Sequence, residues 1–311
     1  MTDISLPIVD RPEYISPTAF KVWKTCAFKY YLKYLTGKKY TFQQTPAMAM
    51  GSLFDAVIKS RLAAELQWYN KDTTLSLGAL LKNVDSSMMH LLPEARRLVD
   101  YYIASGAYKA LLDEVISGIE YDELKHVKAN KYHIAFPIYG KPDLKIGHNI
   151  ITDFKVNGYG SKSGQSPKQG YKRAFDKNGE QGPHEKYGIT MPEIDIDWAT
   201  QLTIYNWLEQ DQELLDLSKD IPVAIEQIAI RGTTTKIASF RAIVPVAFQT
   251  NLYNELKTMW ESILDGKIEK PKPSSERCFP YRTKCEVAQD CNAFQKVFND
   301  NDFNKMLGIK V

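Results

Sequence analysis

The fold of this chain is decided by a stretch near its middle, GKPDLKIGHNIITDFKV, residues 140–156. Two short runs rich in β-branched and apolar residues, 144–146 and 150–156, flank a Gly-His-Asn turn. This pattern predicts two adjacent short strands. If the strands pair antiparallel, Asp143 comes close to Asp153, and strand alternation places Asp153 and Lys155 on one face.

Two carboxylates and one ammonium group at such a place suit a hard divalent cation. Mg²⁺ and Mn²⁺ prefer oxygen ligands and retain bound water, so Asp143 and Asp153 are candidate metal ligands. Lys155 could orient an attacking water molecule and stabilise the negative charge that develops on phosphate. The alternative is that Asp143 is a turn residue and that Asp153 and Lys155 form a solvated strand face.

The sequence on either side predicts an α/β fold in three parts. Residues 1–117 are mainly helical, with Ser16-Pro17 and Thr45-Pro46 as helix starts. Residues 118–265 form a core of a central mixed sheet flanked by helices, with a long loop over 157–193. Residues 266–311 form a cysteine-bearing segment that closes onto the N-terminal helix. One continuous helix is expected from Ser16 to about Leu35, and another from Asp197 to about Leu217.

The composition excludes a basic tail and a histone-like protein that wraps DNA. The formal net charge is only +3, so any surface for nucleic acid must be local. The loop from 156 to 190 carries six basic against three acidic side chains with interleaved aromatics, which fits either stacking on unpaired bases or a solvated loop. No signal peptide and no apolar run of membrane-spanning length is present. We therefore expect a cytoplasmic protein, in a bacterial cell or a phage-infected host, with no membrane partner.

Four sequence elements together resemble the RecB-like branch of the PD-(D/E)xK nuclease superfamily over most of the chain. Its Gly-x-x-Asp turn followed by Asp-x-Lys is matched at Gly140, Asp143, Asp153 and Lys155. Its Gln-x-x-x-Tyr helix motif is matched by the residues Gln201 and Tyr205. The resemblance implies a restriction-endonuclease-like core in which Asp143, Asp153 and Lys155 are catalytic, and Gln201 and Tyr205 bind substrate.

The upstream Gly-x-x-x-His motif of the family is only partly matched, by Gly51-Ser-Leu-Phe-Asp55. The family histidine is a metal ligand, and aspartate can take that place as a hard oxygen ligand. The resemblance therefore implies that Asp55 joins Asp143 and Asp153 in holding Mg²⁺ or Mn²⁺. A surface helix aspartate is the alternative.

Four cysteines are the number needed for a tetrahedral zinc site or an iron–sulfur cluster: Cys26, Cys278, Cys285 and Cys291. In the branch that includes AddB-like and CRISPR-associated exonucleases, one N-terminal and three C-terminal cysteines hold a structural 4Fe-4S cluster. The resemblance implies the same here, although six residues separate Cys278 from Cys285 where the family usually has two. Zn²⁺ or four unligated thiols remain the alternatives.

The expected function is metal-dependent hydrolysis of DNA phosphodiester bonds. The resemblance implies an exonuclease that acts on DNA ends or single strands in recombination, repair or phage replication, with a helicase or recombination protein as a partner. Two alternatives remain open. One is a non-catalytic DNA-binding or scaffold subunit on a nuclease-like fold, and the other is a zinc-stapled interaction protein.

Overall fold

The computed structural model describes residues 3–40, 44–66, 76–118, 127–129, 136–146, 150–160, 195–210, 215–231, 233–279 and 284–298. The chain divides into two units, each built from separate stretches of sequence. The first unit comprises Met1–Phe42, Ala129–Tyr139 and Asn251–Val311, and the second comprises Gln43–Lys128 and Gly140–Thr250. The three-part division expected from the sequence stays a prediction.

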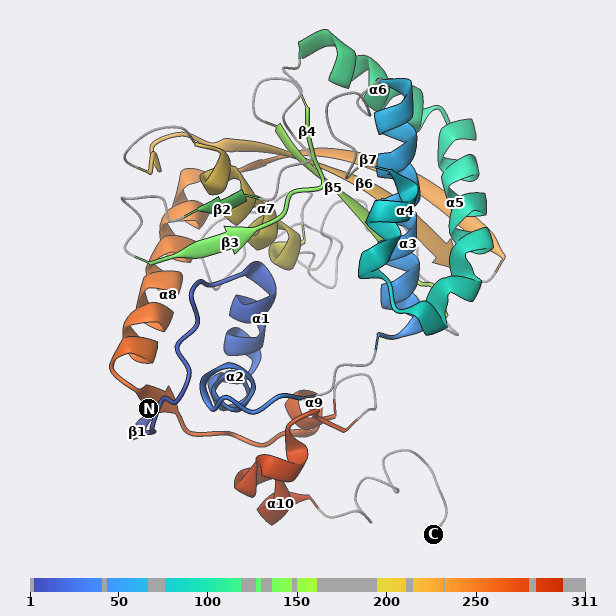
Figure 1. The fold of residues 1–311 in the computed structure, drawn as a ribbon. Coiled ribbons are helices and arrows are strands. Elements are labelled where there is room, and N and C mark those ends of the chain that lie inside the picture. The colour runs from blue at the N-terminus through green and yellow to red at the C-terminus, as the bar shows by residue number, and fades with distance from the viewer. Residues whose placement is uncertain are drawn as a thin grey trace, which may run out of the picture. The chain divides into compact units, whose positions relative to one another are not determined.

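A four-stranded mixed sheet lies in the second unit, in the order β4-β5-β6-β7 (Figure 1). The pairing of β4 with β5 is antiparallel, as the sequence predicts, whereas β5 and β6 are parallel and β6 and β7 antiparallel. The strands are β4 (Leu144–Ile146), β5 (Ile150–Asn157), β6 (Ile221–Arg231) and β7 (Thr234–Val244). A mixed sheet flanked by helices confirms the predicted fold class.

Side-chain caps begin two helices of the second unit, and the first of them is the helix start that the sequence predicts at Thr45-Pro46. The Thr45 hydroxyl accepts the Met48 N–H at 3.3 Å at the start of α3, and Pro46 supplies a first-turn residue that needs no donor. The Asp195 carboxylate caps α7 in the same way through the Asp197 N–H. The helices are α3 (Pro46–Glu65), α4 (Leu77–Leu80), η4 (Leu81–Asn83), η5 (Ser86–Leu91), α5 (Leu92–Ala104), α6 (Ala107–Gly118) and α7 (Ile196–Glu209).

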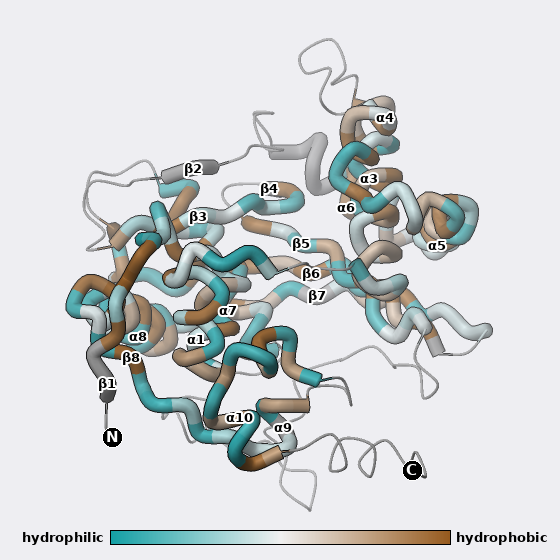
Figure 2. The backbone as a smooth tube through the Cα atoms, turned by 60° about the horizontal axis from the view of Figure 1, so that its bottom comes forward, coloured by the Kyte–Doolittle hydropathy of each residue, from teal (hydrophilic) through white to brown (hydrophobic). Residues whose placement is uncertain are grey.

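The two faces of the sheet have different partners. Phe154 of β5 packs with Phe54 of α3 and Tyr102 of α5, so α3 and α5 cover that face. Hydrophobic and hydrophilic positions alternate along α5, as expected of a helix with one buried side (Figure 2). Strand alternation turns Asp153 and Lys155 to the opposite face, where α7 lies. The polar site is thereby separated from the large apolar core.

The first unit joins the N-terminal helices to the C-terminal segment. Strands β1 and β8 pair antiparallel, and ion pairs link Lys29 and Lys33 to Glu286, and Lys38 to Asp290. Its elements are β1 (Asp3–Ser5), α1 (Pro17–Thr25), α2 (Ala27–Tyr30), η1 (Tyr31–Leu35), β8 (Lys267–Glu269), α9 (Ser275–Cys278), η8 (Ala288–Asp290) and α10 (Asn292–Val297). The short strands β2 (Val127–Ala129) and β3 (Ile138–Gly140) and the helix α8 (Val246–Leu264) span the divisions between the units. Within the described ranges, no helix has both the length and the apolar character needed to cross a membrane.

Two helices differ from the prediction. The helix expected from Ser16 to Leu35 is broken at Cys26, whose backbone is extended (φ −163°, ψ 106°). Cys26 therefore ends α1 and begins α2, and its sulfur accepts the Lys29 N–H at 3.4 Å. Helix α7 ends at Glu209 rather than near Leu217, because the Gln210 side chain bonds to both the N–H and the C=O of Asp216.

Candidate active site

Asp143 is fixed at the point where the chain enters β4. The Phe154 N–H of the neighbouring strand donates to Asp143 Oδ2 at 2.9 Å. This contact follows from the antiparallel register, in which Leu144 lies opposite Thr152. The structure therefore brings the Asp143 carboxylate to the strand that carries Asp153 and Lys155.

Asp153 and Lys155 lie side by side on β5. The Lys155 Nζ atom is 2.5 Å from Asp153 Oδ2, and the Asp153 residue is only 2% exposed. Burial raises the pKa of Asp153 to about 7; Lys155 opposes this rise and the nearby Asp143 adds to it. A buried carboxyl group of this kind gains a strong interaction from any cation placed beside it.

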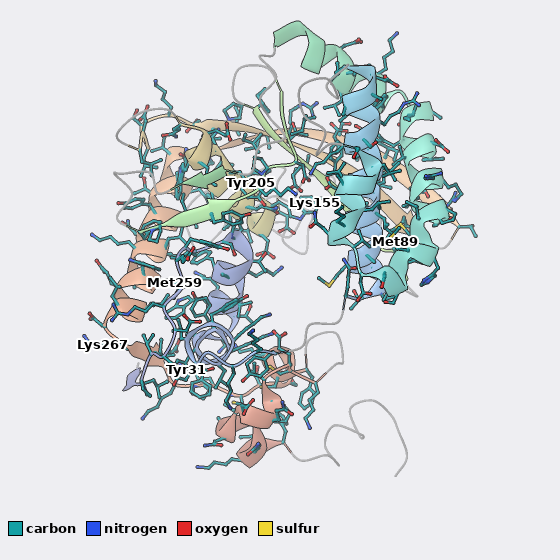
Figure 3. All side chains as sticks on the ribbon, in the orientation of Figure 1. Tyr31, Met89, Lys155, Tyr205, Met259 and Lys267 are labelled. Atoms are coloured by element: carbon teal, nitrogen blue, oxygen red, sulfur yellow. The ribbon has the colours of Figure 1, made fainter. Side chains whose placement is uncertain are left out.

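Gln201 of α7 connects the members of this group. Its Oε1 atom accepts from Lys155 Nζ at 2.7 Å, and its Nε2 atom donates to Asp153 Oδ1 at 3.1 Å and to Tyr205 Oη at 2.9 Å. Gln201 and Tyr205 are four residues apart and so share one helical face. Figure 3 shows Lys155 and Tyr205 together near the sheet. The motif pair predicted to bind substrate thus also orients Asp153 and Lys155.

Gly140 is required by the packing of Tyr205. A Cβ atom at position 140 would lie 2.4 Å from Tyr205 Cδ1 and 2.9 Å from Leu208 Cδ1. Both of these α7 side chains are buried, at 7% and 1% exposure, so neither has free space to move into. The glycine of the Gly-x-x-Asp motif therefore permits α7 to approach the turn that carries Asp143.

A residue that the sequence reasoning missed, Lys59, lies between Asp55 and Asp143. Its Nζ atom is 2.7 Å from Asp55 Oδ1 and 2.8 Å from Asp143 Oδ1, and its side chain is 3% exposed. The only signal for it in the sequence is its position four residues after Asp55 on the same helix. Asp55 therefore approaches the site in an ion pair with Lys59.

Burial and mutual charge interactions set the pKa values of Asp55, Lys59 and Asp143. Burial lowers the pKa of Lys59, but the charges and hydrogen bonds of Asp143 and Asp55 raise it above its usual value. Burial opposes ionisation of Asp143, yet Lys59 and the Phe154 N–H keep the pKa of Asp143 below its usual value. The Asp55 side chain is 29% exposed, although its Oδ1 atom is buried, and burial raises the pKa of Asp55 to about 6.

The Asp143 and Asp153 carboxylates fit a magnesium or manganese ion. Asp153 Oδ2 is buried and accepts no well-aligned hydrogen bond, despite the short distance to Lys155 Nζ. Mg²⁺ is commonly held by one or two carboxylates, with water and substrate phosphate completing its shell. In the part of the chain that the structure describes, no three Cys, His, Asp or Glu side chains form a ready chelating group. Asp143 and Asp153 are the two carboxylates whose positions suit such an ion, and a role for Asp55 as a third ligand stays a prediction.

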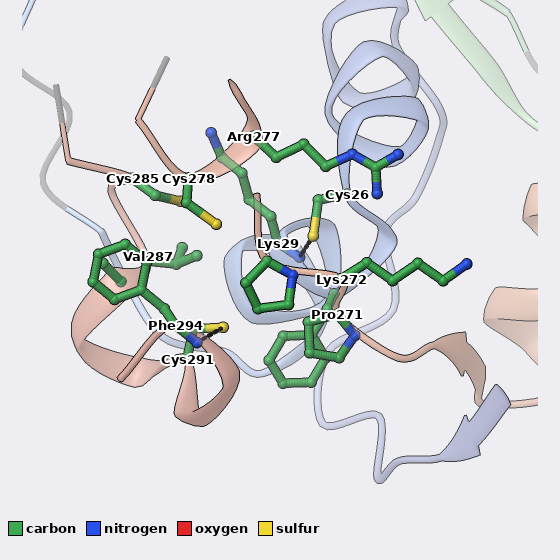
Figure 4. A pocket seen from close by; sticks show the side chains of 13 residues that line it. Cys26, Lys29, Pro271, Lys272, Arg277, Cys278, Cys285, Val287, Cys291 and Phe294 are labelled. Atoms are coloured by element: carbon green, nitrogen blue, oxygen red, sulfur yellow. Dashed lines mark hydrogen bonds between the residues drawn. The ribbon is translucent and has the colours of Figure 1, made fainter. Parts of the chain in front are cut away.

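All four cysteines line one pocket in the first unit (Figure 4). Cys26 comes from the break between α1 and α2, Cys278 from the end of α9, and Cys291 from the start of α10. The Cys285 N–H donates to the Cys278 carbonyl at 2.9 Å, and the Phe294 N–H donates to Cys291 Sγ at 3.4 Å. All four thiols are free. The structure therefore places four cysteines that are distant in sequence around one pocket.

The pocket has features that suit a thiolate-bound group, although the thiols do not already form a chelating set. Backbone N–H groups point at the sulfurs of Cys26 and Cys291, and the basic side chains of Lys29 and Arg277 lie at the pocket. Burial raises the pKa of the Cys285 thiol. Such a thiol becomes a thiolate most readily when a metal takes the place of its proton.

One expected feature falls largely outside the described residues, namely the basic and aromatic loop between 157 and 193. Asn157, at the start of that loop, is described. Its Oδ1 atom accepts from Gln227 Nε2 at 2.7 Å.

The structure thus groups two acidic side chains and one lysine, at the start of β4 and on β5, with a glutamine and a tyrosine from α7, as the resemblance to a metal-dependent nuclease implies. A family model agrees: that of the PD-(D/E)XK nuclease superfamily matches residues 14–292. The chain belongs to this superfamily, whose members are generally nucleases and typically use Mg²⁺ or Mn²⁺. Comparison with curated proteins and with solved structures gives no match.

Proposed function

We propose that this protein is a DNA nuclease that hydrolyses phosphodiester bonds with Mg²⁺ or Mn²⁺. The observation that carries the proposal is the grouping of Asp143, Asp153 and Lys155, with Gln201 bonded to two of them. We further propose that it acts as an exonuclease on DNA ends or single strands in recombination, repair or phage replication. A helicase or recombination protein would then supply the substrate.

Each side chain has a role in this mechanism. Asp143 and Asp153 hold the divalent ion, which when bound lowers the pKa of a water molecule and neutralises phosphate charge. The Lys155 ammonium orients the attacking water and stabilises charge on the phosphate. Gln201 keeps Lys155 and Asp153 in place, and together with Tyr205, to which it is bonded, it positions the substrate. Asp55, held by Lys59, supports Asp143 from the opposite side.

Cleavage of end-labelled linear DNA, single- and double-stranded, tests the proposal. We expect label to be released in the presence of Mg²⁺ or Mn²⁺ and cleavage to stop when EDTA is added, because the carboxylates need the ion to activate water. A folded protein that binds DNA but leaves it intact with both metals would support a non-catalytic DNA-binding or scaffold subunit instead.

Circular substrates separate the two modes of cutting. An exonuclease needs an end, so covalently closed double-stranded circles and single-stranded circles should remain intact while linear DNA of the same sequence is degraded. Cutting of circles at a rate comparable with that of linear DNA would show endonuclease action and leave the catalytic assignment standing.

We also propose that Cys26, Cys278, Cys285 and Cys291 hold a structural 4Fe-4S cluster. The shared pocket and the N–H···S contacts support this proposal, as does the small size of the local core. Among the described residues, the buried members of that core are Phe279, Ala288 and Phe294, with Cys278, Cys285 and Cys291 packed against it. A bound cluster would add folding free energy where apolar burial is slight. Free thiols and a cluster both suit the reducing cytoplasm in which we place the protein.

Metal analysis of anaerobically purified protein distinguishes the possibilities for these cysteines. We expect brown protein with iron and acid-labile sulfide, and we expect Cys26→Ser to lose most of that iron. Thr25→Ala alters the exposed neighbouring residue and should keep it. If the protein contains zinc but no sulfide, the cysteines form a zinc site instead of a cluster. If it contains no metal, the four thiols are unligated.

A further inference from the structure

The side chain of Lys59 fills the place between two carboxylates that face the active site. Its ammonium is 2.7 Å from Asp55 Oδ1 and 2.8 Å from Asp143 Oδ1. A magnesium ion bridging the same two oxygen atoms would lie about 2.1 Å from each. Such an ion would need the space that the ammonium occupies.

Lys59 is held in the interior by its two ion pairs. Its side chain is 3% exposed and starts from α3, among the residues that pack in the apolar core. Withdrawing the ammonium from Asp55 and Asp143 would leave a charge buried without a partner, which is strongly unfavourable. The lysine is therefore a fixed positive charge of the site.

The net charge of the carboxylates and lysines at the site also favours a single metal ion. When all three carboxylates are ionised, Asp55, Asp143 and Asp153 supply three negative charges, and Lys59 and Lys155 supply two positive ones. Lys141, which is half-buried, adds a further positive charge close to Asp55 and Asp143. One divalent ion already gives the group excess positive charge for a substrate phosphate, and a second ion would add two more without a further carboxylate to balance them.

The oxygen atoms of Asp143 and Asp153 that do not contact Lys59 keep free lone pairs. Asp143 Oδ2 accepts from the Phe154 N–H, and Asp153 Oδ1 accepts from Gln201, so both carboxylates are oriented from one side. Each carboxylate oxygen has two lone pairs, and these single contacts leave one free. The unoccupied lone pairs of Asp143 and Asp153 are the ones available to a metal.

We infer that Lys59 acts as a built-in cation that takes the place of a second metal ion, so the protein binds one divalent ion per active site. The inference rests on the proposed metal-dependent function. Lys59 is a positioning residue in this scheme: it holds Asp143 for the single ion between Asp143 and Asp153, and it keeps Asp55 from becoming a ligand.

Counting bound Mn²⁺ tests this inference without DNA and without an activity assay. The full chain is titrated with Mn²⁺ and followed by electron paramagnetic resonance and calorimetry. We expect one Mn²⁺ at the Asp143–Asp153 site of the wild-type protein and a second one in Lys59→Met, where Asp55 and Asp143 become free to bind. The double variant Asp55→Asn/Lys59→Met lacks the extra carboxylate and should return to one.

Lys267→Met is the matched control, because Lys267 forms an ion pair with Asp265 on the surface. It should bind one Mn²⁺, as the wild type does. Thermal unfolding in EDTA checks that each variant is folded; if Lys59→Met is not, Lys59→Gln, which can still donate a hydrogen bond to Asp143, takes its place.

Two sites in the wild-type protein would overturn the inference, as would a folded Lys59→Met variant that still binds one Mn²⁺. If none of the variants folds, the number of Mn²⁺ ions bound by the wild-type protein decides between one and two metal sites. Absence of any Mn²⁺ binding by the wild type would instead remove the proposed metal centre, so the two failures are distinguishable.

Discussion

Asp153→Asn and Lys155→Met are each expected to lower the rate of DNA cleavage by about a hundredfold to a thousandfold or more, with the fold intact. The asparagine keeps the shape of the side chain but removes the charge that would bind the metal. The methionine keeps the length of Lys155 but removes the ammonium that orients water. Rates are measured on linear end-labelled DNA at saturating Mg²⁺, and circular dichroism reports the fold.

A second Asp-x-Lys triplet in this chain provides the control for both changes. Asp265 and Lys267 form an exposed ion pair, 2.9 Å apart, outside the second unit. Asp265→Asn and Lys267→Met remove the same groups and should cleave DNA at the wild-type rate. Full activity in a folded Asp153→Asn or Lys155→Met protein would end the catalytic assignment.

Gly140→Ala is the second change for which we expect a large effect. The new Cβ would lie 2.4 Å from the Tyr205 ring, well inside contact distance. Forcing a methyl group into such packing costs about 1–3 kcal/mol. Relief requires α7 or the turn to shift, which would move Gln201 relative to Asp153. Activity should therefore fall together with stability, measured by chemical denaturation and by the cleavage assay.

Gly51→Ala is the matched control for this substitution. Gly51 lies inside α3, and among the described residues no atom comes within 4 Å of a Cβ built there. Alanine in a helix interior is more stable than glycine by about 0.5–1 kcal/mol. We expect Gly51→Ala to be neutral or stabilising. A Gly140→Ala protein as stable and active as Gly51→Ala would contradict the packing argument.

The sequence predicts the part of the site that strand pairing determines. Alternation along β5 and an antiparallel neighbour are sufficient to place Asp143, Asp153 and Lys155 together. The spacing of Gln201 and Tyr205 predicts one shared helical face, and the structure places that face over β5.

The features that the sequence did not reveal depend on tertiary contacts. A lysine on α3 is expected to be exposed to water, and it is the approach of Asp143, in addition to Asp55 on the same helix, that makes the burial of Lys59 favourable. The sequence around Cys26 has a regular helical pattern, yet the helix breaks there. The Cys26 thiol accepts the Lys29 N–H and so caps the start of a new helix. The steric demand at Gly140 is set by Tyr205, which is distant in sequence.

The buried trio of Asp55, Lys59 and Asp143 has a cost for the fold. Groups of charges inside a protein often stabilise it less than apolar side chains of the same shape would. Only replacement of all three side chains by hydrophobic residues of similar volume would remove that cost, and a protein changed in this way would be more heat-stable but would lack Asp143, one of the two proposed metal ligands. Activity and thermal stability therefore compete within this buried group.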